Sequence, residues 1–233
     1  FIVISNVCLS AKSNLDSLYT IWQDEKISDT IRTTAYINYI WDGYLYSNPD
    51  TSYVLAQKLL HFGKESSYAE AIAIANDLMG ISHYLRSNYS EALNYYQKSL
   101  KIKEEIGSKK GISQTISYIG SIYRQQADYQ KSLKFYLKSL EIDEEIGDKN
   151  NSASNINNIG LIYKDQEDYS KALEYFQRSL KITEENGDKK GVADTYNNIG
   201  ILYNRKQDYT KAIEFYNKSL KISEEIKDKK GIA

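Results

Sequence analysis

Apolar and aromatic residues recur along most of the chain at helical spacing, in a pattern that returns every 40 residues. The stretch DYSKALEYFQRSLKITEENGDKKG, from Asp168 to Gly191, reappears from Asp208 to Gly231, and weaker copies begin at Asp128 and Asn88. A fixed period of this length is typical of stacked supersecondary units. The apolar stripe of the stretch has helical spacing and consists of Leu173, Tyr175, Phe176 and Leu180. The pattern predicts an array of paired α-helices.

The other half of each unit carries a glycine three residues before an aromatic residue or a histidine, as in NNIGLIY at 157–163. Glycine inside a helix costs about 1 kcal/mol against alanine, so its return predicts that a neighbouring helix crosses closely there. The four glycines are Gly80, Gly120, Gly160 and Gly200. The second helix of each unit is expected to begin after a capping residue and to end at a left-handed glycine. These caps are Asn88, Asp128, Asp168 and Asp208 at the start, and Gly107, Gly147 and Gly187 at the end.

These residues resemble the tetratricopeptide repeat, whose unit is two antiparallel helices with small and aromatic residues at fixed places. The third unit supplies Gly160, Tyr163, Tyr169, Ala172, Phe176 and Ser179. The chain departs from the family's usual period of about 34 residues, and its late proline is absent. The family's turn glycine is replaced by Ser87, Ala127, Glu167 and Gln207. The longer repeat is similar to arrays in bacterial signalling proteins and kinesin light chains. The resemblance implies an all-α fold, a right-handed superhelical solenoid of antiparallel helix pairs.

The period divides the chain into successive segments. Four complete units are expected at 71–110, 111–150, 151–190 and 191–230, and residues 231–233 match the start of a further repeat. Residues 12–70 are less regular and are expected to form N-terminal helices followed by a degenerate first repeat at 31–70. Terminal repeats are often atypical because one of their faces has no neighbour.

The chain begins with an apolar run, FIVISNVCLSA, that gives way to polar residues at Lys12. Residues 1–11 resemble the tail of a secretory signal peptide, which predicts export to a periplasmic or extracytoplasmic location. The alternative is a short buried segment of a cytoplasmic protein. No stretch of the sequence is long and apolar enough to span a bilayer.

The charged residues, the cysteine and the histidines exclude several classes of function. The 30 Lys and Arg residues nearly balance the 31 Asp and Glu residues, which argues against a nucleic-acid binder with a basic surface. The single cysteine, Cys8, excludes an internal disulfide and a cysteine-based zinc site. His61 and His83 have no partner spacing typical of a metal or nucleophile site. We therefore expect no catalytic residues, no metal and no cofactor.

The resemblance implies a groove lined by the first helix of each unit, graded from apolar at the front to rich in amides at the back. Neighbouring asparagines in this groove suit an extended peptide, because a side-chain amide both donates and accepts hydrogen bonds. The expected groove residues are Asp77, Leu78, Ile81, Tyr84, Gln114, Tyr118, Arg124, Asn157, Asn158, Lys164, Asp194, Asn197, Asn198 and Asn204.

Three functions remain open at this point. The first is a non-catalytic scaffold that binds a protein or an extended peptide, as the sensory or interaction region of a larger bacterial signal-transduction protein of the cyclase or histidine kinase type. The second is a structural module that forms a homodimer through the ends of the array. The third is an enzyme, for which the sequence offers no catalytic constellation.

Overall fold

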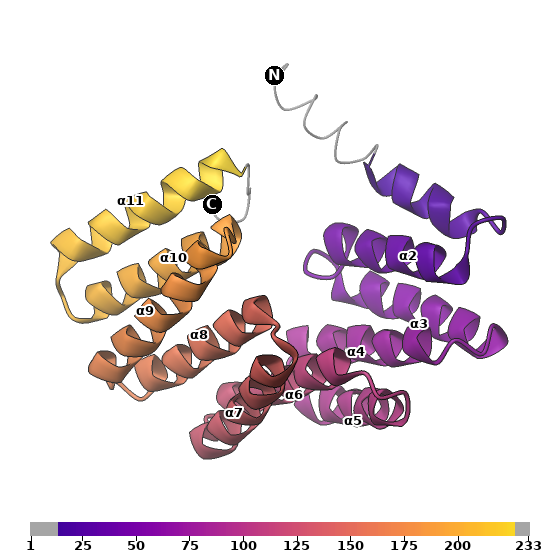
Figure 1. Cartoon of the computed structure of the whole chain (residues 1–233), viewed down its shortest axis with the longest axis horizontal. Helices are drawn as coiled ribbons and strands as arrows, with labels where there is room; N and C mark the ends of the chain where they lie inside the picture. Colours follow the sequence, from indigo (N-terminus) through magenta and orange to yellow (C-terminus); the bar gives the residue numbers. More distant parts are fainter. Residues whose placement is uncertain (1–13, 227–233) are drawn as a thin grey trace. The chain divides into compact units, whose positions relative to one another are not determined.

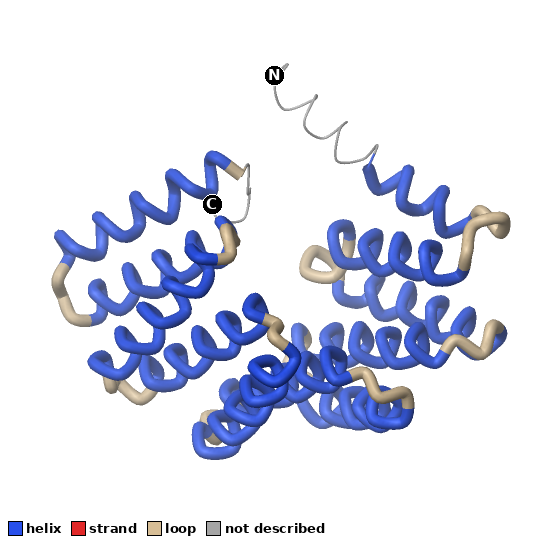
Figure 2. Tube along the Cα trace, viewed as in Figure 1, coloured by secondary structure: helices blue, strands red, loops and turns tan. Residues whose placement is uncertain are grey.

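The computed structural model describes residues 14–226, and every regular element in that range is an α-helix (Figure 2). The expected signal-peptide segment at 1–11 and the expected further repeat at 231–233 lie outside the described residues. The helices pair along the chain as in a helical-repeat solenoid, which confirms the predicted fold class (Figure 1). They fall into two compact units, Phe1–Ser108 and Lys109–Ala233, which we call unit 1 and unit 2.

Unit 1 contains a helix at 14–23, then α2 (Asp29–Gly43), α3 (Pro49–Glu65), α4 (Ala69–Leu85) and α5 (Tyr89–Glu105). α3 packs on α4, and α4 packs on α5. At the start of the unit, Trp22 stacks on the fully buried Tyr36 with ring centroids 4.2 Å apart. The guanidinium of Arg32 lies against Trp22 and Phe62. Aromatic packing therefore replaces the regular repeat core in this part of the chain.

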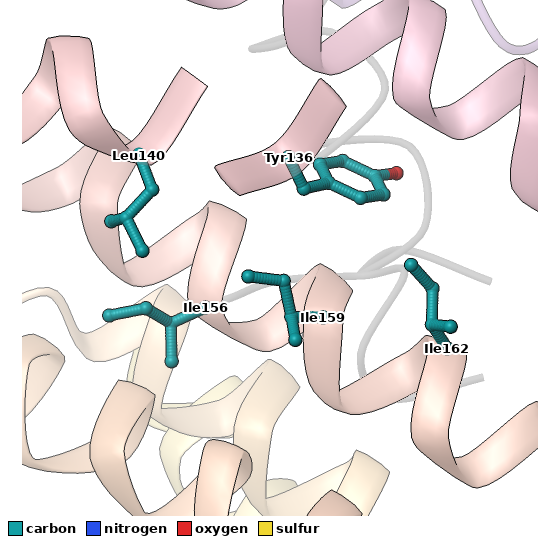
Figure 3. Packing of buried hydrophobic residues seen from close by; sticks show 5 residues of the cluster. All are labelled: Tyr136, Leu140, Ile156, Ile159 and Ile162. Atoms are coloured by element: carbon teal, nitrogen blue, oxygen red, sulfur yellow. The ribbon is translucent and has the colours of Figure 1, made fainter. Parts of the chain in front are cut away.

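Within the described residues, unit 2 contains three helix pairs that recur every 40 residues. They are α6 (Lys109–Gln125) with α7 (Tyr129–Ile146), α8 (Lys149–Asp165) with α9 (Tyr169–Glu185), and α10 (Lys189–Arg205) with α11 (Tyr209–Glu225). Each second helix also packs against the next first helix, α7 on α8 and α9 on α10. One core cluster joins Tyr136 and Leu140 of α7 to Ile156, Ile159 and Ile162 of α8 (Figure 3).

The helix ends follow the predicted capping chemistry with one exception. The carboxylates of Asp128, Asp168 and Asp208 accept hydrogen bonds from the backbone N–H three residues on, at 3.1–3.2 Å. Gly107, Gly147 and Gly187 have φ of +68° to +70°, as expected of left-handed caps. Asn88 occupies the cap position of α5, but its side chain accepts no capping hydrogen bond. The sequence therefore identified the position of this cap but not its contact.

Each repeated glycine lies where an aromatic ring of the second helix of the pair packs against the backbone of the first helix. A Cβ atom at Gly160 would lie 2.7 Å from Cε1 of Phe176, and one at Gly200 would lie 2.6 Å from Cε1 of Tyr216. These distances are far below ordinary van der Waals contact, so a side chain at these places would displace the ring. The predicted close crossing is confirmed.

Candidate functional site

The first helices of unit 2 lie side by side, because α8 contacts both α6 and α10. We call the surface that they form the inner-helix face. The groove residues predicted in this unit are all partly or fully accessible. They are Gln114, Tyr118 and Arg124 of α6, Asn157, Asn158 and Lys164 of α8, and Asp194, Asn197, Asn198 and Asn204 of α10.

Asparagine amides link α8 to α10 on this face. Nδ2 of Asn198 donates a 3.0 Å hydrogen bond to Oδ1 of Asn157, one repeat earlier. The bond uses one donor and one acceptor, so Oδ1 of Asn198 and Nδ2 of Asn157 keep hydrogen-bonding capacity. The amide of Asn158 makes no hydrogen bond within residues 14–226. The amides are therefore held in place while part of their capacity stays unused.

A charged cluster lies at one end of the inner-helix face, at the last turns of α6, α8 and α10. Nη1 of Arg124 pairs with Oδ2 of Asp165 at 2.8 Å, and Nζ of Lys164 lies 3.7 Å from Oδ1 of the same carboxylate. Burial lowers the pKa of Lys164; Asp165 raises it, and Arg124 and Arg205 lower it. Two cations thus share the carboxylate of Asp165, and the charge of Arg205 also acts on Lys164. Cations in the last turn of a helix are favoured by the helix dipole, so this cluster is explained without a ligand.

A cavity of about 200 Å³ opens on the inner-helix face between the first halves of α8 and α10. Three of the residues lining it were predicted: Asn157, Asn158 and Asp194. The others are Ala153, Ser154, Ser179, Thr183, Asp188, Gly191 and Thr195. These residues were not predicted, because each is typical of a cap or a packing position within its own repeat. The signal that identifies them is the difference between each repeat and the one before it.

The apolar front of the predicted groove is corrected by the structure of unit 1. Leu78 is 1% exposed and Ile81 is 7% exposed, so both belong to the packed interior of the unit. Asp77 is also buried and forms an ion pair with the buried Lys103 of α5. A buried ion pair of this kind is not available to a ligand, and loss of one partner would leave an uncompensated charge. Of the four residues predicted on α4, only Tyr84 remains partly accessible.

The two histidines lie in unit 1 in different surroundings. His83 stacks on Tyr95 at 5.4 Å and meets the edge of Tyr53 at 5.2 Å. Burial lowers its pKa, and Arg86 lowers it further. His61 is exposed and lies 3.1 Å from Glu65. Within residues 14–226, no group of three or more histidine, cysteine or acidic residues is placed to hold a metal ion.

Solved structures with this arrangement of helices come from several proteins. BtubC (BKLC) from P. vanneervenii superposes with a TM-score of 0.64 at 19% identity, over 94% of this chain and 91% of that one. A Rap protein complexed with Competence and Sporulation Factor gives 0.73 at 17% identity, over 94% of this chain and 60% of that one. Aspartyl phosphate phosphatase F from Bacillus subtilis gives 0.67 at 19% identity, over 87% of this chain and 54% of that one. At these identities, the likeness shows the fold alone.

Family comparison by sequence agrees with the helix pairs. No curated protein matches the chain significantly. Two models described as tetratricopeptide repeat match it, one at 111–185 and 151–225 and the other at 77–106. Together these matches cover residues 77–106 and 111–225, from the second half of α4 to the end of α11. The chain belongs to the tetratricopeptide repeat family.

Proposed function

We propose that the chain is a non-catalytic scaffold that binds an extended peptide on the inner-helix face of unit 2. The observation that carries this proposal is the linked pair of amides, Asn157 and Asn198, with the amide of Asn158 beside it. Amides fixed by each other lose little side-chain entropy when a ligand arrives, and preorganisation of this kind favours binding. A peptide backbone offers the alternating donors and acceptors that such amides can meet.

The comparisons support binding as the general function. Tetratricopeptide repeats typically serve as protein-interaction scaffolds, and one of the similar structures is a complex with Competence and Sporulation Factor. Another is named a phosphatase, and this chain spans 54% of that protein. Neither described histidine of the present chain forms a nucleophile–base pair, which supports a binding role.

The setting in a larger bacterial signal-transduction protein is part of this proposal and rests on the sequence resemblance of the long repeat. No helix within residues 14–226 has the length and apolar character needed to cross a bilayer.

The test is a peptide-library screen on the wild-type chain and on the double variant Asn158→Ala/Asn198→Ala. Each amide contact contributes about 0.5–1.5 kcal/mol net, so we expect the captured peptides to bind the variant roughly five- to a hundred-fold more weakly. Thermal unfolding must be measured in parallel, because Asn198 also bonds to Asn157 within the protein.

Asn217→Ala is the matched control, since Asn217 is an exposed asparagine on α11, away from the inner-helix face. We expect that variant to capture the same peptides as the wild-type chain. Equal capture by the double variant, or no capture by the wild-type chain, would contradict the proposal.

A second candidate function, self-association, is favoured by the exposed face of α11. Ile213 is 59% exposed, whereas Leu173, one repeat earlier, packs into the cluster with Ile199 and Leu202. Tyr209 is also 59% exposed, whereas its counterpart Tyr169 joins the same cluster. Within the described residues these positions of α11 are exposed, and self-association of two copies of the chain would cover them.

A further inference from the structure

The cavity between α8 and α10 has a filled counterpart one repeat earlier, between α6 and α8. There, Asp143 of α7 accepts hydrogen bonds from Ser113 of α6 at 2.5 Å and from Asn155 of α8 at 2.7 Å. In the later interface, Thr183 stands in the place of Asp143, and Thr195 in the place of Asn155. Gly191 stands in the place of Asn151. The two shorter threonine side chains therefore leave open part of the space that a polar network fills one repeat before. The place of the Asn151 side chain is not open, because a Cβ at Gly191 would lie 2.5 Å from Oδ2 of Asp188 and 2.7 Å from Cγ2 of Thr183.

The missing side chains also change the balance of charge. In the earlier interface, Nζ of Lys110 lies 3.0 Å from Oδ2 of Asp148. The counterpart of Asp148 is Asp188, and the counterpart of Lys110 is Asn150. Asp188 uses Oδ1 to cap the backbone N–H of Gly191 at 3.0 Å, and it forms no ion pair within residues 14–226. The cavity thus keeps the carboxylate of this interface but lacks its cation.

The rest of the lining agrees with this charge. A second carboxylate, Asp194, lines the cavity, and no lysine or arginine does. The hydroxyls of Thr183 and Thr195 donate to carbonyl oxygens of their own helices, so they do not occupy the space. A water molecule takes about 30 Å³ in the liquid, so a space of about 200 Å³ has room for a side chain.

We propose that this cavity binds the cationic end of a side chain, a guanidinium or an ammonium group, of the peptide on the inner-helix face. Asp188 and Asp194 supply the opposite charge, and the amide oxygen of Asn158 accepts a hydrogen bond from the incoming group. The ligand thereby takes the place that Lys110 holds beside Asp148 in the preceding interface. This inference rests on the proposed peptide function for its biological meaning, but the cavity can be tested without a peptide.

The charges along the inner-helix face determine at which end a basic side chain of the peptide binds. Asp194 and Arg205 lie on the same helix, 11 residues apart, which is about 16 Å at 1.5 Å per residue. The cations at the last turns of α8 and α10 repel a basic side chain at that end of the face. A basic side chain is therefore directed to the end that carries the cavity.

The direct probe is N-acetyl-L-arginine amide, titrated into isotopically labelled protein and followed by amide NMR signals. N-acetyl-L-citrulline amide is the matched probe, because it has nearly the same shape without the charge. We expect arginine amide to shift the side-chain signals of Asn157 and Asn158, and citrulline amide to bind about tenfold more weakly, the lower end of what a hydrogen bond to a charged group contributes. Added salt should weaken the arginine signal, since these carboxylates are reached by solvent.

Two variants assign the effect to the cavity. Asn150→Lys places a lysine of the chain itself beside Asp188, as Lys110 lies beside Asp148 in the preceding interface. We expect this lysine to compete with arginine amide and to weaken its binding about tenfold. Asp194→Asn removes one charge and should act in the same direction. The exposed Asn217→Lys makes the same chemical change as Asn150→Lys away from the face and should leave binding unaltered.

The outcomes separate this inference from the proposed function. Equal shifts with arginine and citrulline amides, or an Asn150→Lys variant that binds as the wild type does, would overturn the cation site. Captured peptides without a basic residue would also overturn it, while leaving the peptide function in place. Arginine amide that binds a chain which captures no library peptide would support the cavity and contradict the peptide function.

Discussion

At the scale of single residues, the turns between paired helices carry backbone strain. The sequence showed only that other residues replace the family's glycine in these turns. Ser87, Ala127, Glu167 and Gln207 have φ between +57° and +63°, the left-handed region in which the family's glycine would stand. A Cβ atom in this region costs roughly 1–2 kcal/mol. The turns persist because the hydrogen bonds around them are complete, as in the 2.9 Å bond from the N–H of Asp128 to the carbonyl of Tyr123.

The first prediction concerns this strain. Ala127→Gly should stabilise the chain by about 0.5–1 kcal/mol, because the relief of strain exceeds the extra freedom of glycine in the unfolded chain. Gly147→Ala should destabilise by a similar amount, although a Cβ there would meet nothing within 4 Å. Urea unfolding of both variants measures the two effects. The same sign for both would contradict the assignment to backbone conformation.

The second prediction compares two helix glycines. A Cβ at Gly160 would lie 2.7 Å from the ring of Phe176, whereas one at Gly120 would lie 3.3 Å from the ring of Tyr136. Alanine gains about the same helix propensity at both places. Gly160→Ala should therefore be less stable than Gly120→Ala by about 1–3 kcal/mol, the usual cost of overpacking. Thermal unfolding of the two variants side by side decides it, and equal stability would contradict a tighter crossing at Gly160.

At the scale of helices, buried hydroxyl and carboxyl groups fix how one helix sits on the next. In each pair of unit 2, a serine of the second helix donates to a carbonyl of the first: Ser139 to Ser113, Ser179 to Ala153 and Ser219 to Ala193, at 2.8–2.9 Å. Within the described part of unit 2, Asp143 adds a further network to one interface, with its side chain fully buried between α6, α7 and α8. The repeats are therefore alike in backbone but distinct in their buried polar contacts.

The third prediction concerns Asp143. Burial raises the pKa of its carboxyl, against the lowering effect of the hydrogen bonds from Ser113 and Asn155. Because the folded pKa then lies above the unfolded one, the folded chain binds more protons between the two values and loses stability as the pH rises through the folded pKa. Asp143→Asn has no such titration. We expect the unfolding free energy of the variant minus that of the wild type to increase as the pH rises through this window.

Urea unfolding at a series of pH values measures this difference. Titrations of the other carboxylates are common to both proteins and cancel in it. A difference that stays constant across the acid range, or that falls as the pH rises, would contradict a raised pKa for Asp143.

At the scale of the whole molecule, an array of repeats is held together by contacts between neighbours. A face that is buried in each internal pair is therefore unpartnered wherever no neighbour follows. Within the described residues, Tyr209 and Ile213 of α11 are exposed. The net charge of −1 supplies little repulsion against self-association.

The fourth prediction tests the α11 face. Light scattering during size-exclusion chromatography should give a mass that rises with the concentration of the wild-type chain, and Ile213→Lys should abolish the rise. Leu137→Lys is the matched control, because Leu137 is an exposed leucine on α7 outside that face, 50% exposed. A wild-type mass that does not change with concentration would contradict self-association through α11.

The sequence by itself determined the period, the helix ends and the place of each close crossing. These features depend on residues within one repeat: a capping aspartate such as Asp168, a left-handed glycine such as Gly147, and a helix glycine such as Gly160. Each of these residues recurs in several repeats, so the same local signal appears several times in one chain. Most of the candidate face in unit 2 followed from the same register.

Only the tertiary structure decided what depends on side chains that meet across repeats. Asp77 finds its partner Lys103 on another helix, which removes it from the accessible surface. Asn157 and Asn198 meet from neighbouring repeats, 41 residues apart. The cavity beside Asp188 exists because two side chains from two helices, Thr183 and Thr195, are small together. Helix periodicity indicates on which face of a helix a residue lies. The space that remains between two packed helices depends on the volume of every side chain between them.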